Sequence, residues 1–302
     1  RKKDGFLNVI SIFSFIGISL GVAVLIIVMS VMNGFRTELI NKIVGFNPHI
    51  TVKSYDNNGI DRDKLNNNNL NFITKNLIFS NSGEAIILKN NTSKGIVLRG
   101  YQTKEFSNLT IIKNDKFKGD KSKLDKNSIS IGNELSFSLD LKIGDKITLM
   151  SPSGVETIIG SMPKQKTFEI TSIFNSGLAD FDNNIAIINL DTLDDFFGFE
   201  KKDRNLEIYL KDPKNIEEQK QIVQKIFDQE FIYTWADMNS SLFSALKVER
   251  NVMFIILSLI IIVAAFNIIS GLTILVKNKT RDIAILKSIG VLNRSIVKIF
   301  FL

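Results

Sequence analysis

The feature that most constrains this chain is a long uncharged stretch near its carboxyl end. No charged residue occurs between Arg250 and Lys277, and a helix of about 20 apolar residues is enough to cross the hydrocarbon core of a bilayer. The stretch is apolar on every helical face, whereas a helix on a water-soluble domain hides only one stripe. It therefore predicts a transmembrane helix within residues 247–277.

A second apolar run follows the basic amino terminus. Residues 5–35 carry no charge, which exceeds the roughly 7 to 15 apolar residues of a secretory signal. We therefore expect a cytoplasmic start, an uncleaved first transmembrane helix and a helical stalk within residues 1–46. Gly17 and Gly21 have the small-xxx-small spacing that lets a neighbouring helix approach closely in a membrane.

Residues 47–246 have the composition of an α+β domain. Short β-branched runs bounded by Gly, Asn, Asp and Ser predict strands, and amphipathic stretches predict helices. The predicted strands are residues 50–53, 84–89, 95–99, 146–150, 168–174, 185–188, 206–210 and 231–234, and the predicted helices are residues 133–139, 190–197 and 216–227. The order strand, helix, strand over residues 206–234 indicates a split βαβ unit of the ferredoxin-like type.

One connection in this domain is unusually long. Between the strands at residues 146–150 and 168–174 the chain holds two prolines, two glycines and two lysines, and it exceeds the two to five residues of most hairpin loops. Long loops on a rigid frame are where binding is concentrated. The sequence leaves two readings of this segment open: a loop that binds a partner, and a mobile sheet edge without one.

The distribution of Lys and Arg predicts the orientation in the membrane. These residues are more frequent at the amino terminus and just after the second span than at the two inner flanks of the large domain. This bias favours the cytoplasm for both ends and the opposite side for the domain. Apolar residues at the end of the chain predict the start of a truncated third span over residues 293–302.

Composition excludes several classes of function. The net charge is +7, but the lysines are interspersed with acidic residues and form no basic stripe with aromatic residues, so nucleic-acid binding is not expected. The chain has no cysteine and a single histidine, His49, so neither thiolate chemistry nor a multi-histidine metal site is expected. We expect His49 to be structural, and the pairs Asp194-Asp195 and Glu217-Glu218 to lie on solvated helix surfaces.

The sequence also lacks a phosphate-binding loop and a nucleophile elbow. We therefore expect no cofactor and no catalytic residue, and any nucleotide hydrolysis must occur on a partner. Residues 278–292 are suited to receive that partner as a short amphipathic cytoplasmic helix, with Ile283, Leu286 and Ile289 as apolar anchors. The alternative is an ordinary connecting loop that lies on anionic membrane lipid.

Three motifs, in order along the chain, resemble the LolC/LolE permeases of the lipoprotein-releasing ABC transporter. They are the first-span sequence Ser14 to Ala23 with Val28 to Phe35, the hairpin sequence Ser151-Pro152-Ser153-Gly154, and the segment Asp282 to Gly290. The resemblance implies a membrane α-helical permease with an inserted periplasmic α+β domain of MacB-like fold. It also implies four spans, of which this chain would hold two and the start of a third.

The resemblance further implies the function and the partners. A permease of this kind takes lipoproteins from the outer leaflet of the bacterial inner membrane and passes them to a LolA-like periplasmic carrier. It assembles with a second LolC/LolE-type permease subunit and a LolD-like ATPase, and it has no catalysis of its own. The implied ATPase-coupling residues are Asp282, Ile283, Ala284, Ile285, Leu286, Lys287, Ile289 and Gly290, and the implied hook for the carrier is Pro163, Lys164, Gln165 and Lys166.

Two readings compete with this one. A MacB- or FtsX-type permease for export or cell division shares the Ile283 to Leu286 motif but is disfavoured by Met32-Asn33-Gly34-Phe35 and by the hairpin. A membrane sensor with an extracytoplasmic ligand domain predicts a cytoplasmic signalling domain after Leu302. Departures from the family pattern at Gly177-Leu178 and Asp282 leave LolC-like, LolE-like and fused forms open.

Overall fold

The structure is a computed structural model that divides the chain into two compact units. One unit comprises residues 1–37 with 241–302, and the other comprises residues 38–240. The described residues are 2–55, 58–89, 92–113, 115–157, 160–213 and 215–301. Each unit is described separately below.

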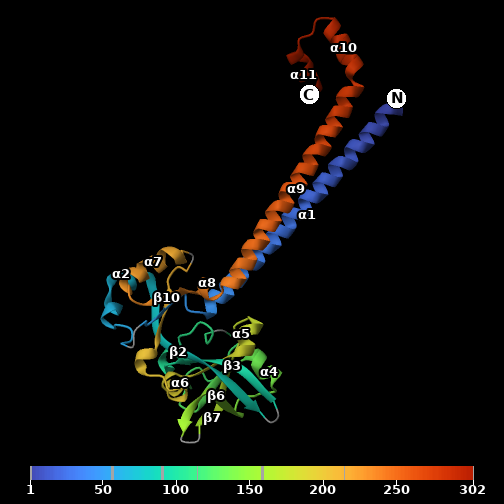
Figure 1. The fold of residues 1–302 in the computed structure, drawn as a ribbon. Coiled ribbons are helices and arrows are strands. Elements are labelled where there is room, and N and C mark those ends of the chain that lie inside the picture. The colour runs from blue at the N-terminus through green and yellow to red at the C-terminus, as the bar shows by residue number, and fades with distance from the viewer. Residues whose placement is uncertain are drawn as a thin grey trace. The chain divides into compact units, whose positions relative to one another are not determined.

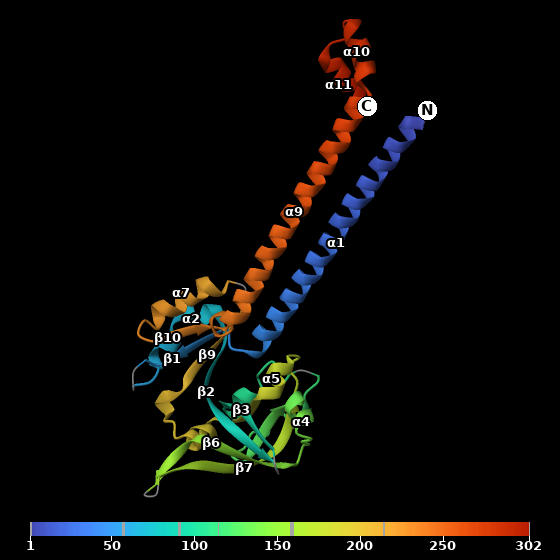
Figure 2. The same cartoon turned by 45° about the vertical axis from the view of Figure 1, so that its right-hand side comes forward.

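The first unit is helical (Figures 1 and 2). Its elements are the first part of α1 (Lys2–Phe46), α9 (Ser240–Asn278), α10 (Thr280–Ser288) and α11 (Asn293–Phe301). Two helical segments, Phe15–Phe46 and Ser240–Asn278, are long and apolar enough to cross a membrane. Their apolar side chains are exposed, for example Phe15 at 72% and Phe254 at 66%, so these helices need lipid or partner helices around them.

The second unit consists of two lobes that share strand β2 (Thr74–Lys89). In the first, which we call the sheet lobe, the strand order is β10-β1-β9-β2. Its elements are β1 (Ile50–Lys53), β9 (Asn205–Leu210), β10 (Phe231–Thr234), α2 (Asn68–Ile73) and α7 (Ile216–Ile226). Strand β1 is antiparallel to both β9 and β10, so β9 and β10 are parallel to each other, and α7 connects them.

The other lobe, which we call the barrel lobe, is a closed sheet. Strand β2 pairs with β3 and β6, β3 with β8, β8 with β5, β5 with β7, and β7 with β6. These strands are β3 (Thr92–Tyr101), β5 (Ser128–Gly132), β6 (Lys146–Thr157), β7 (Gly160–Phe174) and β8 (Ile185–Asn189). Short helices surround them: α3 (Thr103–Phe106), α4 (Asn133–Ser138), α5 (Ala179–Asn184) and α6 (Leu190–Phe197).

The inside of the barrel is a hydrophobic core to which all six strands contribute. Its buried members include Ile87, Leu98, Ile131, Leu149, Ile170 and Ile188. Because successive strand residues point to opposite faces, the outer face of the same strands is free to build a second cluster. That second cluster contains Phe106, Phe117, Phe174, Ile187 and, from the end of α1, Phe46.

The predicted strands and helices are present, but several boundaries differ. Strand β2 begins at Thr74 rather than Glu84, because its first half pairs with β9 and its second half with β3. Strand β5 and helices α2 and α5 were not predicted. The segment between residues 150 and 168, predicted as a long loop, is mostly paired strand, and its Ile158 and Ile159 lie outside the described residues.

Candidate functional site

The arm is the part of the β6–β7 hairpin that extends from the barrel, residues 151–157 and 160–166. The two strands pair from Met150↔Gln165 to Thr157↔Gly160, with a register shift between Met150 and Gly154. Strand β2 pairs with β6 only as far as Met150. Beyond that point the described arm strands pair with each other alone, and such open edges tolerate proline in a strand.

The four residues proposed for the hook lie on β7 in the arm. Pro163 and Gln165 are exposed. The Lys164 Nζ donates to the carbonyl of Asp195, and the Lys166 Nζ lies 5.3 Å from the ring centroid of Phe168. Burial lowers the pKa of Lys166, although the charge of Asp195 opposes this. The structure thus brings both lysines to the base of the arm, where each has a contact on the barrel.

The proposed coupling residues lie on α10 and its carboxyl end. Ile283 and Leu286 are half-buried, whereas Ile285 is 52% and Ile289 is 72% exposed. The exposed apolar row of this segment therefore differs from the anchors predicted from the sequence, of which only Ile289 is strongly exposed. Gly290 ends the helix with φ of +86°, a left-handed conformation that glycine adopts without strain.

Gly17 and Gly21, predicted to admit a neighbouring helix, differ in their surroundings. A Cβ at Gly21 would lie 4.0 Å from Ile260 of α9, while nothing described lies within 4 Å of that position at Gly17. At the far end of the same helix pair a cavity of about 360 Å³ opens between α1 and α9. Its lining is Met29, Ser30, Met32, Asn33, Arg36, Leu246, Glu249, Arg250 and Met253.

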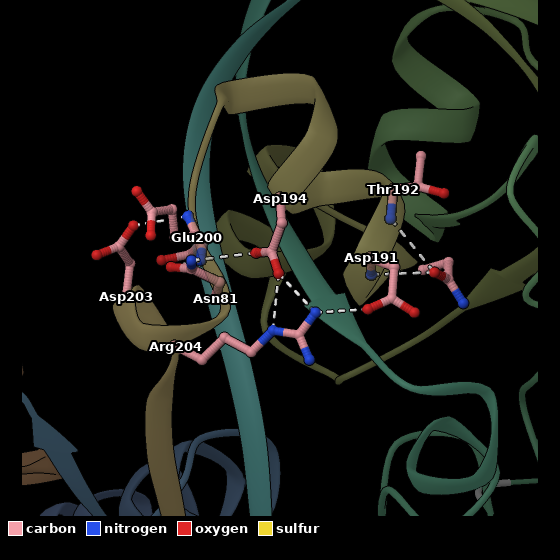
Figure 3. Close-up of polar contacts among 9 residues, drawn as sticks. Asn81, Asp191, Thr192, Asp194, Glu200, Asp203 and Arg204 are labelled. Carbon is pink, nitrogen blue, oxygen red and sulfur yellow. Dashed lines mark hydrogen bonds and ion pairs between the residues drawn. The ribbon is translucent and has the colours of Figure 1, made fainter. Parts of the chain in front are cut away.

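A buried ion pair joins the two lobes of the second unit (Figure 3). Arg204, just before β9, donates from Nε to Asp194 of α6 at 2.7 Å and from Nη2 to Asp191 at 2.5 Å. Asn81 of β2 donates to the other Asp194 oxygen at 3.3 Å. Arg204 and Asp194 are each 5% exposed, and burial raises the pKa of Asp194 while Arg204 opposes the rise.

The expectation that Asp194 is solvated is therefore wrong. The carboxylate lies at the place where both chain segments that connect the lobes pass α6, and Arg204 compensates its charge. A buried charge of this kind needs a partner, but the partner is 10 residues away across a turn and no local pattern marks it. Asp195, Glu217 and Glu218 are exposed as expected.

A second polar cluster lies at the same junction. Glu207 of β9 accepts hydrogen bonds from Ser80 at 2.6 Å, Tyr209 at 3.0 Å and Tyr101 at 3.2 Å. Burial raises the pKa of both tyrosines, and the neighbouring Glu207 raises it further. Both tyrosines therefore stay protonated and donate to the acid.

His49 has a structural role, as expected from its isolation in the sequence. Its Nδ1 accepts the backbone N–H of Leu210 at 2.8 Å, and its carbonyl accepts the N–H of Trp235 at 3.1 Å. Burial lowers the pKa of His49. Among the described residues no cluster of three or more His, Asp and Glu side chains could hold a metal ion.

Comparison with known proteins shows the family to which the chain belongs. Residues 11–226 match the model of the MacB-like periplasmic core domain. A lipoprotein-releasing system transmembrane protein LolC from Neisseria meningitidis is 31% identical, over 99% of this chain and 74% of that protein. The chain belongs to the LolC/LolE family.

Both branches of the LolC/LolE family are similar to this chain. A LolE from Haemophilus influenzae is 27% identical over 99% of the chain and 74% of its own length. Among solved structures, the periplasmic region of MacB from Actinobacillus actinomycetemcomitans is 11% identical with a TM-score of 0.38, covering 66% of this chain and 95% of that one. The family assignment depends on the sequence matches and not on this weak overall superposition.

Proposed function

We propose that this chain is a permease subunit of a lipoprotein-releasing ABC transporter, powered by a partner ATPase. The observation that carries the proposal is the match to lipoprotein-releasing system proteins over 99% of the chain. Such a permease is an inner-membrane protein with several spans and its large domain in the periplasm. The two long exposed apolar helices and the excess of basic residues at their outer flanks support this arrangement.

The partners follow from the same proposal. A LolD-like ATPase would dock on α10, a second LolC/LolE-type permease would complete the assembly, and a LolA-like carrier would bind the arm. The apolar cavity between α1 and α9, with three methionines and two arginines in its lining, supports a site for amphiphilic substrate. Methionine side chains adapt their shape to varied apolar ligands.

The proposed fold of the large domain includes a ferredoxin-like part. Its support is the strand order β10-β1-β9-β2 together with one helix after β1 and another after β9. These are the order and connections of a βαββαβ unit into which the barrel lobe is inserted between β2 and β9.

The proposal is tested by purifying the full-length protein with its membrane partners and identifying what accompanies it. We expect a Walker-type ATPase and a bound triacylated lipoprotein, and after reconstitution we expect ATP-dependent transfer of that lipoprotein to a soluble carrier. An ATPase without lipoprotein would support the MacB- or FtsX-type alternative, for which the MacB-like domain match is the favouring observation. Absence of both would leave only a sensor role.

The arm is tested separately by reversing its charge. Replacing Lys164 and Lys166 by glutamate should weaken carrier binding, and the remaining binding should respond less to salt because the attraction between opposite charges is lost. Lys142→Glu, at an exposed position between α4 and β6, is the matched control. Carrier affinity equal to that of the parent protein would remove the arm from the binding surface.

A further inference from the structure

The end of α1 is attached to the second unit in two different ways. The polypeptide continues from Phe46 into the sheet lobe, where Ile50 of β1 pairs with both β9 and β10. The side chain of Phe46, in contrast, is buried in the barrel lobe, with its ring 4.9 Å from Phe181 and 6.3 Å from Phe174. The covalent path thus joins α1 to one lobe, and side-chain packing joins it to the other.

Arg99 of β3 completes the attachment to the barrel. Its guanidinium carbon lies 4.8 Å from the ring centroid of Phe46, and its Nη2 donates to Asn47 Oδ1 at 2.8 Å. Asn47 is 3% exposed and donates in turn to the carbonyl of Ile43 at 3.3 Å. A planar guanidinium that stacks and donates at once restricts both the distance and the orientation of its partners.

The same arginine lies beside the polar cluster between the lobes. Burial raises the pKa of Tyr101 and of Tyr209, and the positive charge of Arg99 opposes the rise at both. Tyr101 follows Arg99 by two residues on β3 and donates to Glu207 of the sheet lobe. Arg99 is therefore placed where the end of α1, the barrel and the sheet lobe meet.

We propose that Arg99 is a positioning residue that makes the barrel lobe follow α1, so that displacement of the first span is delivered directly to the arm. Without Arg99, the end of α1 would be held to the barrel by the packing of Phe46 on Phe174 and Phe181 alone, and no hydrogen bond from β3 would fix the orientation of Asn47. The role of the Arg99 contact in lipoprotein release depends on the proposed function. The contact and its mechanical effect do not.

Residues 1–302 contain no cysteine, so pairs of introduced cysteines can carry spin labels for a distance measurement. Spin labels would be placed at Asn41→Cys with Lys118→Cys, which reports on the barrel, and at Asn41→Cys with Glu217→Cys, which reports on the sheet lobe. All three positions are exposed. In the full-length protein, Arg99→Ala should increase about tenfold the fraction of molecules in which the barrel has separated from the end of α1, the undocked population, as read from the first pair of labels. This change corresponds to a contact of about 1.4 kcal/mol. The distance between the second pair, which reports on the sheet lobe, should not change.

Two further variants distinguish the loss of the Arg99 contact from a general destabilisation of the second unit. Arg62→Ala removes an arginine that stacks on Phe79, at 5.1 Å, within the sheet lobe, and should change neither distance. Arg99→Lys keeps the positive charge but loses the planar guanidinium, and should give an intermediate undocked population. An unchanged barrel distance in Arg99→Ala, or equal broadening of both distances, would overturn the proposal.

The same variants are then assayed for lipoprotein released per ATP hydrolysed. Arg99→Ala should lower this ratio while ATP hydrolysis and carrier binding persist, and Arg62→Ala should not lower it. If the parent protein released no lipoprotein, the proposed function would fail while the distance measurement would still decide the role of Arg99. If the distances responded but the ratio did not, Arg99 would position the barrel without serving release, and the proposal would be wrong in its functional half.

Discussion

At the scale of single residues, the lobes are held by buried polar groups that have specific partners. Asp182 of α5 is 2% exposed, and its carboxylate accepts the backbone N–H of Ser176 at 2.8 Å. Burial raises the pKa of Asp182, and the hydrogen bonds from Ser176 oppose this only in part. The charged form of this acid is therefore tolerated less well in the folded protein than in the unfolded chain.

The raised pKa of Asp182 predicts a pH dependence with a definite sign. Because the folded-state pKa is raised, the contribution of Asp182 to stability is present below the unfolded pKa and is lost as pH rises through the folded pKa. Asp182→Asn, which keeps the Oδ1 acceptor, should equal the parent near pH ~3.5 and become increasingly more stable than the parent toward pH ~7. Thermal unfolding across this range measures it, with exposed Asp180→Asn of the same helix as control.

Gly132 at the start of α4 makes a second prediction at this scale. A Cβ there would lie 2.0 Å from the carbonyl oxygen of Asp182, so Gly132→Ala must displace backbone and should cost about 1–3 kcal/mol. Gly95→Ala in β3, where nothing described lies within 4 Å, should be close to neutral. Equal melting temperatures for the two variants would contradict the packing seen around α5.

At the scale of elements, α10 and the arm show what sequence periodicity can and cannot predict. The amphipathic pattern correctly located α10, and Gly290, with its positive φ, follows the carboxyl end of the helix. It did not identify the exposed row, since the predicted anchors Ile283 and Leu286 are half-buried. Ile285, Ile289 and Leu292 remain exposed.

The exposed row predicts which substitution tests docking of the ATPase. Ile289→Glu replaces a side chain that is 72% exposed, so it should leave folding intact and reduce co-purification of the ATPase, since a charge would have to be desolvated in the interface. Leu286→Glu is a less clean test because Leu286 is half-buried. Ser288→Glu is the matched control, and loss of the ATPase in that variant too would point to charge alone rather than to apolar docking.

In the arm, the local sequence predicts a loop where the structure has paired strands. Two prolines and the glycines of residues 151–167 favour a loop when they are read locally. The structure pairs residues 154–157 with residues 160–163 as strands, and the open edges of an arm beyond the barrel tolerate a proline that lacks an N–H. The turn residues of a segment do not indicate whether another strand will pair with it. The presence of that strand depends on how the barrel closes, and the residues that close it are far away in the sequence.

At the scale of the whole molecule, the two long apolar helices and the α+β class of the large domain could be predicted from the sequence alone, since length and period carry that information. The closed barrel could not. Its closing pair joins β2 to β6, for example Ile87↔Leu149. These segments are far apart in the chain, and the local sequence of neither strand indicates that it pairs with the other. The same is true of Arg204, whose partners are defined only once α6 has packed on β2.

The membrane arrangement predicts opposite accessibility for two labelled positions. Because residues 1–302 contain no cysteine, Asp115→Cys and Arg281→Cys each place one reactive site within them. A membrane-impermeant maleimide should modify Asp115→Cys in cells with a permeabilised outer membrane, and should modify Arg281→Cys only after the inner membrane is opened. Modification of both positions from the same side would contradict the proposed topology.

The position of the barrel within the chain has a consequence for how this architecture can be altered. The polypeptide leaves the sheet lobe at Asn81 and returns at Arg204, and these two residues bind the same carboxylate of Asp194. The entrance and exit of the barrel are therefore neighbours in space, which is the geometry that allows one domain to be spliced into another. A barrel taken from a relative, with its own arm, could be grafted between these two points, and the specificity of the arm could be exchanged without redesign of the helices that enter the membrane.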